Sequence, residues 1–139
     1  EKTREELRED GFFITGDLGF IDDKSYLQII GRNKDLIIAG GYNIYPKEIE
    51  LILDDQPGVL ESAVIGVPHA DFGESVVGVL VPDSSGLLDL EKITETVAVS
   101  LAKFKQPRKL IVVDVLPRNA MGKVLKNILR DTYGPAGME

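Results

Sequence analysis

The chain has 139 residues, of which 43% are hydrophobic and 28% charged, so we expect one domain, or one domain and a fragment of another, whose core needs no disulfide or metal. The net charge of −7 argues against a nucleic-acid surface. The absence of cysteine and the single histidine, His69, exclude a disulfide framework, a thiolate zinc site and a multi-histidine metal site. No apolar run has membrane-spanning length and no signal peptide is visible, so we expect a cytoplasmic protein with neither a membrane nor a nucleic-acid partner.

The N-terminal part predicts a short helix and two strands. It begins without methionine and with a charged stretch, residues 2–9, that predicts an exposed helix, so we interpret the chain as a piece of a longer protein. An extended segment, "FFITGDLGFID", follows. Strands are predicted at Tyr26–Ile30 and at Leu36–Ala39, the second followed by a glycine pair. Because these two strands are close in sequence, we expect them to form a β-hairpin.

The remainder predicts helices alternating with strands. "PKEIELILDDQPG" predicts a helix with Pro46 in its first turn and a Pro-Gly step at its end. The valine-rich runs "SAVIGV" and "SVVGVLV" predict strands. A second helix, with Asp89 as N-cap, is predicted in "DLEKITETVAVSLAKF", and a third strand in "KLIVVDV". The last helix is expected from about Lys123 to Tyr133, ended by Gly134–Pro135, with residues 134–139 as a disordered tail.

This order of elements predicts an α+β fold. Strands separated by helices, with one direct strand–strand connection, are typical of a small sheet on which helices pack. We therefore expect an N-terminal β-hairpin, then a small, mainly antiparallel three-stranded sheet packed with about three helices.

Two polar clusters lie in the N-terminal third. Asp17 follows a glycine turn, where a carboxylate can accept hydrogen bonds from the vicinal hydroxyls of a ribose; the alternative is an ordinary turn aspartate. Arg32 follows a predicted strand and could reach a ribose or a phosphate. Gly40 and Gly41 allow close approach of another molecule to the backbone. The alternative is a hairpin followed by an ordinary loop.

Two basic clusters lie in the C-terminal third. "KFKQPRK", residues 103–109, places four cations in seven residues and could hold a phosphate group; the alternative is a solvated helix end. Lys123 follows Gly122, at or near the expected start of the last helix. Helix N-termini favour anions and disfavour lysine, so Lys123 makes best sense if an anion comes to it. The alternative is a plain surface lysine.

Taken together, these stretches resemble the adenylate-forming superfamily of acyl-CoA synthetases, peptide-synthetase adenylation domains and luciferases. "ITGD" resembles its ribose-binding motif, "GRNKDLIIAGGYNIYPKEIE" its hinge motif and "LPRNAMGK" its catalytic-lysine motif. The resemblance covers about residues 9–133. Within the superfamily, "IGVPHADFGE", "LAKFKQPRK" and "LPRNAMGKVLKNILR" look most like malonyl-CoA and methylmalonyl-CoA synthetases.

The resemblance implies a domain organisation and a reaction. Residues 1–33 correspond to the end of a large N-terminal domain, and residues 34–133 to the mobile C-terminal domain of an acyl-CoA synthetase. Such enzymes first form an acyl-adenylate and diphosphate from a carboxylate and ATP, and coenzyme A then displaces AMP to give the thioester. ATP, Mg²⁺ and coenzyme A are the implied cofactors, with Mg²⁺ bound mainly by the N-terminal domain. The implied partners are that domain and a small carboxylic acid.

The resemblance also implies roles for single residues. Lys123 corresponds to the adenylation lysine, whose ammonium stabilises the charge that builds on the α-phosphate and the carboxylate. It also corresponds to a frequent acetylation target, so a lysine acetyltransferase is a further implied partner. The remaining assignments are Asp17 and Arg32 for the nucleotide, Lys34 for the hinge, and Gly40, Gly41, Phe104 and Arg108 for coenzyme A.

Part of the implied active site is not found in this chain. The Ser/Thr/Gly-rich phosphate-binding loop and the acyl pocket of the family have no counterpart in these residues. We therefore expect the chain alone to be inactive and to carry no information about the acyl group. Two alternatives remain: a fragment of an adenylation domain that loads a carrier protein, and a non-catalytic binding module or acetyltransferase substrate.

Overall fold

The computed structural model describes residues 17–21, 24, 27–32 and 35–137. The chain divides into two compact units, residues 1–34 and 35–139. This division falls one residue after the boundary expected from the sequence. The predicted helix over residues 2–9 and the predicted hinge residue Lys34 lie outside the described residues. In the part of the chain that is described, no helix is long and apolar enough to cross a membrane.

The described part of the first unit is a β-hairpin. Strand β1 (Asp17–Ile21) pairs antiparallel with β2 (Leu27–Arg32), with a bulge between Leu18 and Gly19. Asp17 and Arg32 are directly opposed in this ladder. The ladder therefore places the backbones of the two residues assigned to the nucleotide next to each other.

A second hairpin opens the second unit. Strand β3 (Ile37–Ala39) pairs with β4 (Tyr42–Ile44) across Gly40 and Gly41, whose φ angles are +58° and +84°. Positive φ at both central residues defines the two-residue turn that matches the twist of a hairpin. The sequence-based pairing was therefore wrong. Strand β2 pairs with β1, the strand before it, and β3 pairs with β4 across the glycine pair.

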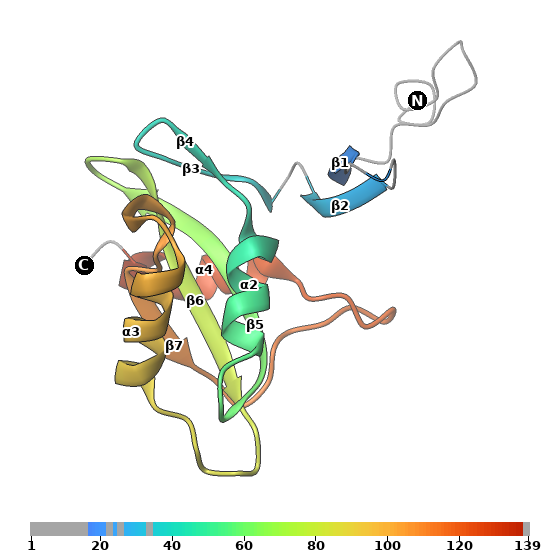
Figure 1. The fold of residues 1–139 in the computed structure, drawn as a ribbon, viewed down its shortest axis with the longest axis vertical. Coiled ribbons are helices and arrows are strands. Elements are labelled where there is room, and N and C mark those ends of the chain that lie inside the picture. Colours follow the sequence, from blue (N-terminus) through green and yellow to red (C-terminus); the bar gives the residue numbers. More distant parts are fainter. Residues whose placement is uncertain (1–16, 22–23, 25–26, 33–34, 138–139) are drawn as a thin grey trace. The chain divides into compact units, whose positions relative to one another are not determined.

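The main sheet has three strands in the order β5-β6-β7 (Figure 1). Strands β5 (Val59–His69) and β6 (Gly73–Pro82) form a long antiparallel hairpin. Strand β7 (Lys109–Val112) pairs with β6 in parallel over four positions. The helix α3 (Leu90–Ser100) and the short 3₁₀ helix η2 (Lys103–Lys105) form the crossover that a parallel connection needs. The mainly antiparallel sheet and the α+β class are confirmed.

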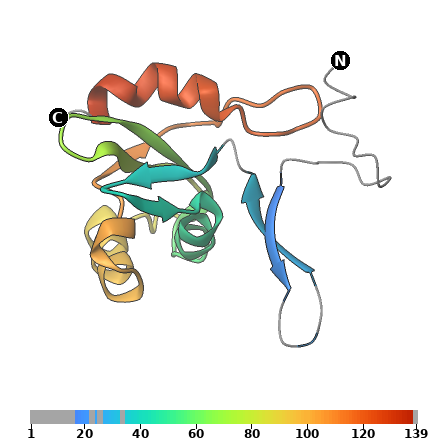
Figure 2. The same ribbon diagram turned by 90° about the horizontal axis from the view of Figure 1, so that it is seen from above.

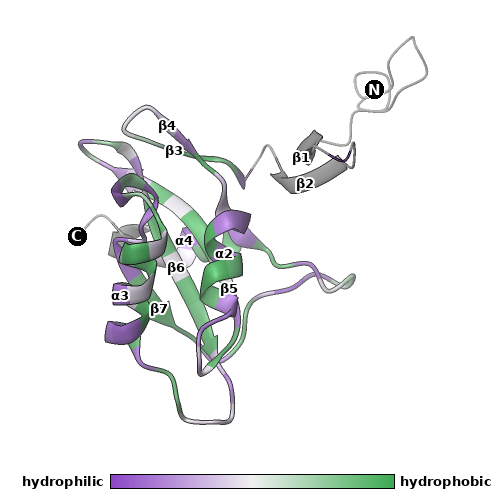
Figure 3. Cartoon of the chain, viewed as in Figure 1, coloured by the Kyte–Doolittle hydropathy of each residue, from purple (hydrophilic) through white to green (hydrophobic). Residues whose placement is uncertain are grey.

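Helices cover both faces of this sheet. Helix α2 (Pro46–Asp54) and α3 pack on one face and α4 (Lys126–Gly137) on the other (Figure 2). Both β5 and β6 are hydrophobic along much of their length (Figure 3), because strand side chains alternate between two buried faces. The core on the α2–α3 side contains Val64, Val76, Leu80, Ile49, Leu53, Ile93 and Val97. The core on the α4 side contains Ala63, Ile65, Val67, Val77, Val79, Leu116 and Leu129.

Local signals fixed the starts of two helices correctly. Pro46 occupies the first turn of α2, and the Asp89 carboxylate accepts hydrogen bonds from the backbone N–H groups of Glu91 (3.1 Å) and Lys92 (3.2 Å). An N-cap of this kind satisfies two of the four N–H groups that lack a partner inside the helix.

The prediction for the last helix was wrong at both ends. Helix α4 begins at Lys126, three residues after Lys123, and continues through Gly134 and Pro135 to Gly137. It starts late because the Lys123 backbone is hydrogen-bonded within a loop: its N–H donates to Asn119 Oδ1 (3.0 Å) and its carbonyl accepts from Asn119 N (2.9 Å).

Candidate functional site

The segment Leu116–Leu125 forms a closed loop that presents Lys123 to solvent. Leu116 is buried at its start, whereas Gly122 and Lys123 are exposed. Arg118 and Val124 form an antiparallel bridge across the loop. In Figure 2 this segment, in orange, extends from the body of the second unit.

Asn119 organises the tip of this loop. Its Oδ1 accepts hydrogen bonds from the backbone N–H groups of Met121 (2.9 Å) and Lys123 (3.0 Å), and its carbonyl accepts from Gly122 N (2.9 Å). Gly122 has φ +84°, and a Cβ added there would find nothing within 4 Å. The turn is thus held by hydrogen bonds and by a backbone angle that glycine adopts readily, not by side-chain packing.

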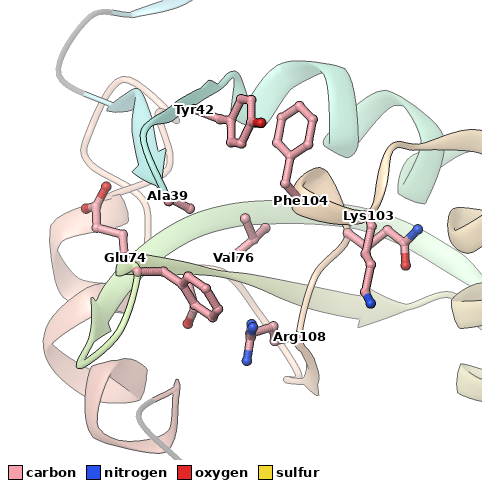
Figure 4. A pocket seen from close by; sticks show the side chains of 11 residues that line it. Ala39, Tyr42, Glu74, Val76, Lys103, Phe104 and Arg108 are labelled. Carbon is pink, nitrogen blue, oxygen red and sulfur yellow. The ribbon is translucent and has the colours of Figure 1, made fainter.

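A pocket of about 440 Å³ lies between the β3–β4 hairpin, the start of β6 and η2. Aromatic rings form much of its wall: Tyr42 from β4, Phe72 from the β5–β6 turn and Phe104 from η2. Tyr42 and Phe104 stack with their ring centroids 4.3 Å apart and an interplanar angle of 20° (Figure 4). Lys103 and Arg108 bring positive charge to the same pocket.

Hydrogen bonds and charge hold the pocket together. Arg108 Cζ lies 4.6 Å from the centroid of the Phe72 ring, and its backbone N–H donates to Val76 O (2.9 Å). Gly40 N donates to Phe72 O (2.9 Å), which joins the β3–β4 turn to the β5–β6 turn. Glu74 accepts a hydrogen bond from Ile38 N (2.7 Å). Three segments far apart in sequence are therefore fixed around one cavity.

This arrangement suits a planar base that carries phosphates. Aromatic faces stack on nucleobases with little regard to sequence, and guanidinium and ammonium groups bind phosphate. In the described part of the chain there is no group of three or more His, Cys, Asp or Glu residues that could hold a metal ion, so the structure identifies no Mg²⁺ ligands.

The structure brings together some of the predicted site residues and not others. Gly40, Phe104 and Arg108 line the pocket. Gly41 is adjacent to Gly40 but is not among the lining residues. Lys123 lies on the separate Leu116–Leu125 loop. Asp17 and Arg32 are paired in the β1–β2 ladder of the first unit, whereas the pocket belongs to the second unit.

Sequence reasoning missed two of the aromatic residues of the pocket. Tyr42 directly follows the glycine pair, and Phe72 lies in the "PHADFGE" turn. Both are large apolar side chains in glycine-containing turns, where a plain turn more often carries small polar residues. That signal could have marked them, but only the folded chain shows that they share a cavity.

The fold and these two features define the class of protein to which the chain belongs. The profile of the family described as "AMP-binding enzyme C-terminal domain" matches residues 48–123, more than half of the chain. The chain belongs to this family of adenylate-forming enzymes, as its motifs predicted.

Individual relatives are CoA ligases. The chain is 44% identical to the long-chain-fatty-acid–CoA ligase FadD13 of Mycobacterium tuberculosis over 96% of its length and 26% of the relative. The structure of ATP-bound MatB from Rhodopseudomonas palustris shows 59% identity and a TM-score of 0.89, over 98% of this chain and 27% of that one. The o-succinylbenzoate CoA synthetase MenE of Bacillus subtilis, solved with its acyl-adenylate, shows 39% identity and a TM-score of 0.85, over 94% and 27%. This chain thus spans about a quarter of the length of these proteins.

Proposed function

We propose that the chain acts as the C-terminal domain of an AMP-forming acyl-CoA ligase. Its Leu116–Leu125 loop serves the first half-reaction, and its aromatic pocket serves the second. The observation that carries the proposal is the separation of two chemistries on one unit. An exposed lysine sits on an ordered loop, and a pocket with aromatic walls and cations lies on other elements. Family membership and the CoA-ligase relatives support this assignment.

In the first half-reaction Lys123 enters the nucleotide site of the large domain. Its ammonium contacts the α-phosphate and the attacking carboxylate and stabilises the charge that develops between them, without a proton transfer. Asp17 and Arg32, opposed in the β1–β2 hairpin, bind the ribose. ATP and its Mg²⁺ are held mainly by the large domain, and Lys34 is the hinge about which the small domain turns. Acetylation of Lys123 by a lysine acetyltransferase would remove its charge and stop this step.

In the second half-reaction the pocket binds the nucleotide part of coenzyme A. The adenine stacks on the aromatic pair Tyr42 and Phe104, whose own rings are already in contact, and Arg108 with Lys103 binds phosphate. Gly40 and Gly41 leave room for the pantetheine arm at the turn of the β3–β4 hairpin. The sulfur then displaces AMP from the adenylate.

The proposed acid is malonate or methylmalonate, and the proposed location is the cytoplasm. The acid rests on the resemblance of three segments to malonyl-CoA and methylmalonyl-CoA synthetases and on the 59% identity to MatB. Relatives named for long-chain fatty acids and for 2-succinylbenzoate match over nearly the same span. The acyl group is therefore selected outside this chain.

A domain graft tests the proposed function. The chain replaces the matching quarter of MatB from Rhodopseudomonas palustris. The first half-reaction, adenylation, is measured by diphosphate exchange. The second is measured as thioester formation from preformed malonyl-adenylate. We expect both half-reactions to be retained within about 10-fold of the parent, because a 59% identical domain keeps the docking geometry. A folded graft that catalyses neither step would show that the chain is a non-catalytic module.

In the same graft, Arg108→Ala is expected to raise the KM for coenzyme A about 10-fold, the loss of one charge-assisted contact, and to leave adenylation unchanged. Pantetheine, which lacks the nucleotide, is the matched substrate, and its KM should not change. Lys92→Ala, which removes an exposed cation from α3 outside the pocket, serves as the control variant. An equal rise in KM for both thiols would contradict the placement of the nucleotide in this pocket.

A further inference from the structure

The side chain of Arg118 connects the tip of the Leu116–Leu125 loop to the central sheet. Its Nη1 donates a hydrogen bond to the carbonyl of Gly122 (2.6 Å), and its Nη2 donates to the carboxylate of Glu61 on β5. Because the guanidinium is planar and presents its donors in a fixed fork, these two bonds set the position of Gly122 relative to β5.

The Gly122 carbonyl belongs to the peptide unit that joins Gly122 to Lys123. Arg118 therefore holds the carbonyl of this peptide, and Asn119 holds its N–H, which belongs to Lys123 and donates to Asn119 Oδ1. At the tip itself no packing replaces these bonds, since Gly122 is exposed with open space around it. The direction in which the lysine side chain leaves the backbone thus depends on the Arg118 bridge together with the Asn119 hydrogen bonds.

The base of the loop is fixed independently. Leu125 N donates to Pro117 O (2.8 Å), and Lys126 Nζ lies 2.7 Å from Glu50 Oε1, which also accepts from Val64 N on β5 (3.0 Å). Loss of Arg118 would therefore release the tip while the base stays in place. The Arg118 and Glu61 side chains are 39% and 30% exposed, and ion pairs this exposed contribute little to stability.

We propose that Arg118, anchored by Glu61, is a positioning residue for the adenylation lysine. It fixes the Gly122–Lys123 peptide to the sheet, so that Lys123 moves with the body of the domain and reaches the reacting phosphate in one geometry. This inference rests on the proposed function of Lys123 and adds two residues, neither of which touches a substrate.

Hydrogen exchange on the 139-residue chain itself tests the structural part. Arg118→Gln and Glu61→Ala are expected to speed exchange of the Gly122 and Lys123 amides on the order of 10-fold, because the tip opens more often, while the β6 amides keep their protection. Asp54→Ala is the matched control: its carboxylate accepts a hydrogen bond from Ser62 Oγ (2.6 Å), next to Glu61 on β5, so the variant removes a polar contact beside Glu61 and leaves the Arg118 bridge in place. Unchanged exchange at the tip would overturn the proposal.

The catalytic part is tested in the MatB graft. Arg118→Gln and Glu61→Ala should lower the adenylation rate on the order of 10-fold to 100-fold, the effect of a small misplacement of a catalytic group. Thioester formation from preformed adenylate should stay within about 2-fold of the unsubstituted graft, because Lys123 does not act in that step. A merely structural role would lower both steps together, and that result, or no loss in either, would overturn the proposal.

Exchanging the two charges separates positioning from simple ion pairing. The double variant Glu61→Arg/Arg118→Glu restores an ion pair, but a carboxylate at position 118 cannot donate to the Gly122 carbonyl. We therefore expect adenylation to remain impaired, and full recovery would overturn the proposal.

The unsubstituted graft distinguishes the proposed function from this inference. If the unsubstituted graft is inactive, the proposed function fails and this inference with it. If it is active but its variants do not lose adenylation selectively, only the positioning role is contradicted.

Discussion

Replacement of Lys123 by alanine is expected to lower the rate of acyl-adenylate formation by about 10²-fold to 10³-fold. It should leave thioester formation from preformed adenylate nearly unchanged. The ammonium stabilises charge that exists only in the first transition state, and removal of one such preorganised group has an effect of this size. The two rates are measured in the MatB graft by diphosphate exchange and by thioester release. Lys123→Gln, which resembles acetyl-lysine, should behave like the alanine variant.

The control for this prediction lies on the same turn. Met121 is 93% exposed, and Met121→Ala shortens a neighbouring side chain without changing charge or the Asn119 hydrogen bonds, which involve only its backbone. It should retain adenylation within about 2-fold, as surface substitutions away from special features usually do. Equal losses of both half-reactions in the Lys123→Ala variant would contradict the assigned role.

Gly58→Ala is expected to lower the free energy of unfolding by at least about 3 kcal/mol, through two penalties that act together. The φ angle of Gly58 is +85°, and a Cβ added there would lie 2.2 Å from Leu88 N and 2.6 Å from Leu87 C. Both atoms are backbone, so relief requires a shift of the β6–α3 connection. That shift would also strain the hydrogen bond from Asp83 N to Gly58 O (2.9 Å). Urea unfolding of the chain, followed by circular dichroism, measures the loss.

Gly86→Ala separates the two penalties. Gly86 has a similar φ, +73°, but nothing lies within 4 Å of an added Cβ. This variant should lose only the backbone term, about 1 kcal/mol. If both alanine variants were destabilised equally, the close approach at Gly58 would carry no cost.

The family could be recognised from sequence because its motifs are contiguous. "GRNKDLIIAGGYNIYPKEIE" and "LPRNAMGK" each lie within one segment, so their recognition needs no knowledge of folding. The valine-rich strands and the Asp89 cap were predicted correctly for the same reason: alternation, propensity and capping act within a few residues. The prediction of where the last helix starts failed because a loop hydrogen bond from the Lys123 N–H to Asn119 Oδ1 competed with helical structure at Lys123.

By itself, the sequence determined the α+β class and the family, and it predicts that Lys123 meets an anion. Only the tertiary structure decided which strands pair, that Tyr42, Phe72 and Phe104 share one pocket with Arg108, and that Arg118 ties the lysine loop to Glu61. The physical reason is the range of the interactions. Propensities and caps act between near neighbours in sequence. The pocket, and the bridge between Arg118 and Glu61, which are 57 residues apart in sequence, exist only after the sheet has brought distant segments together.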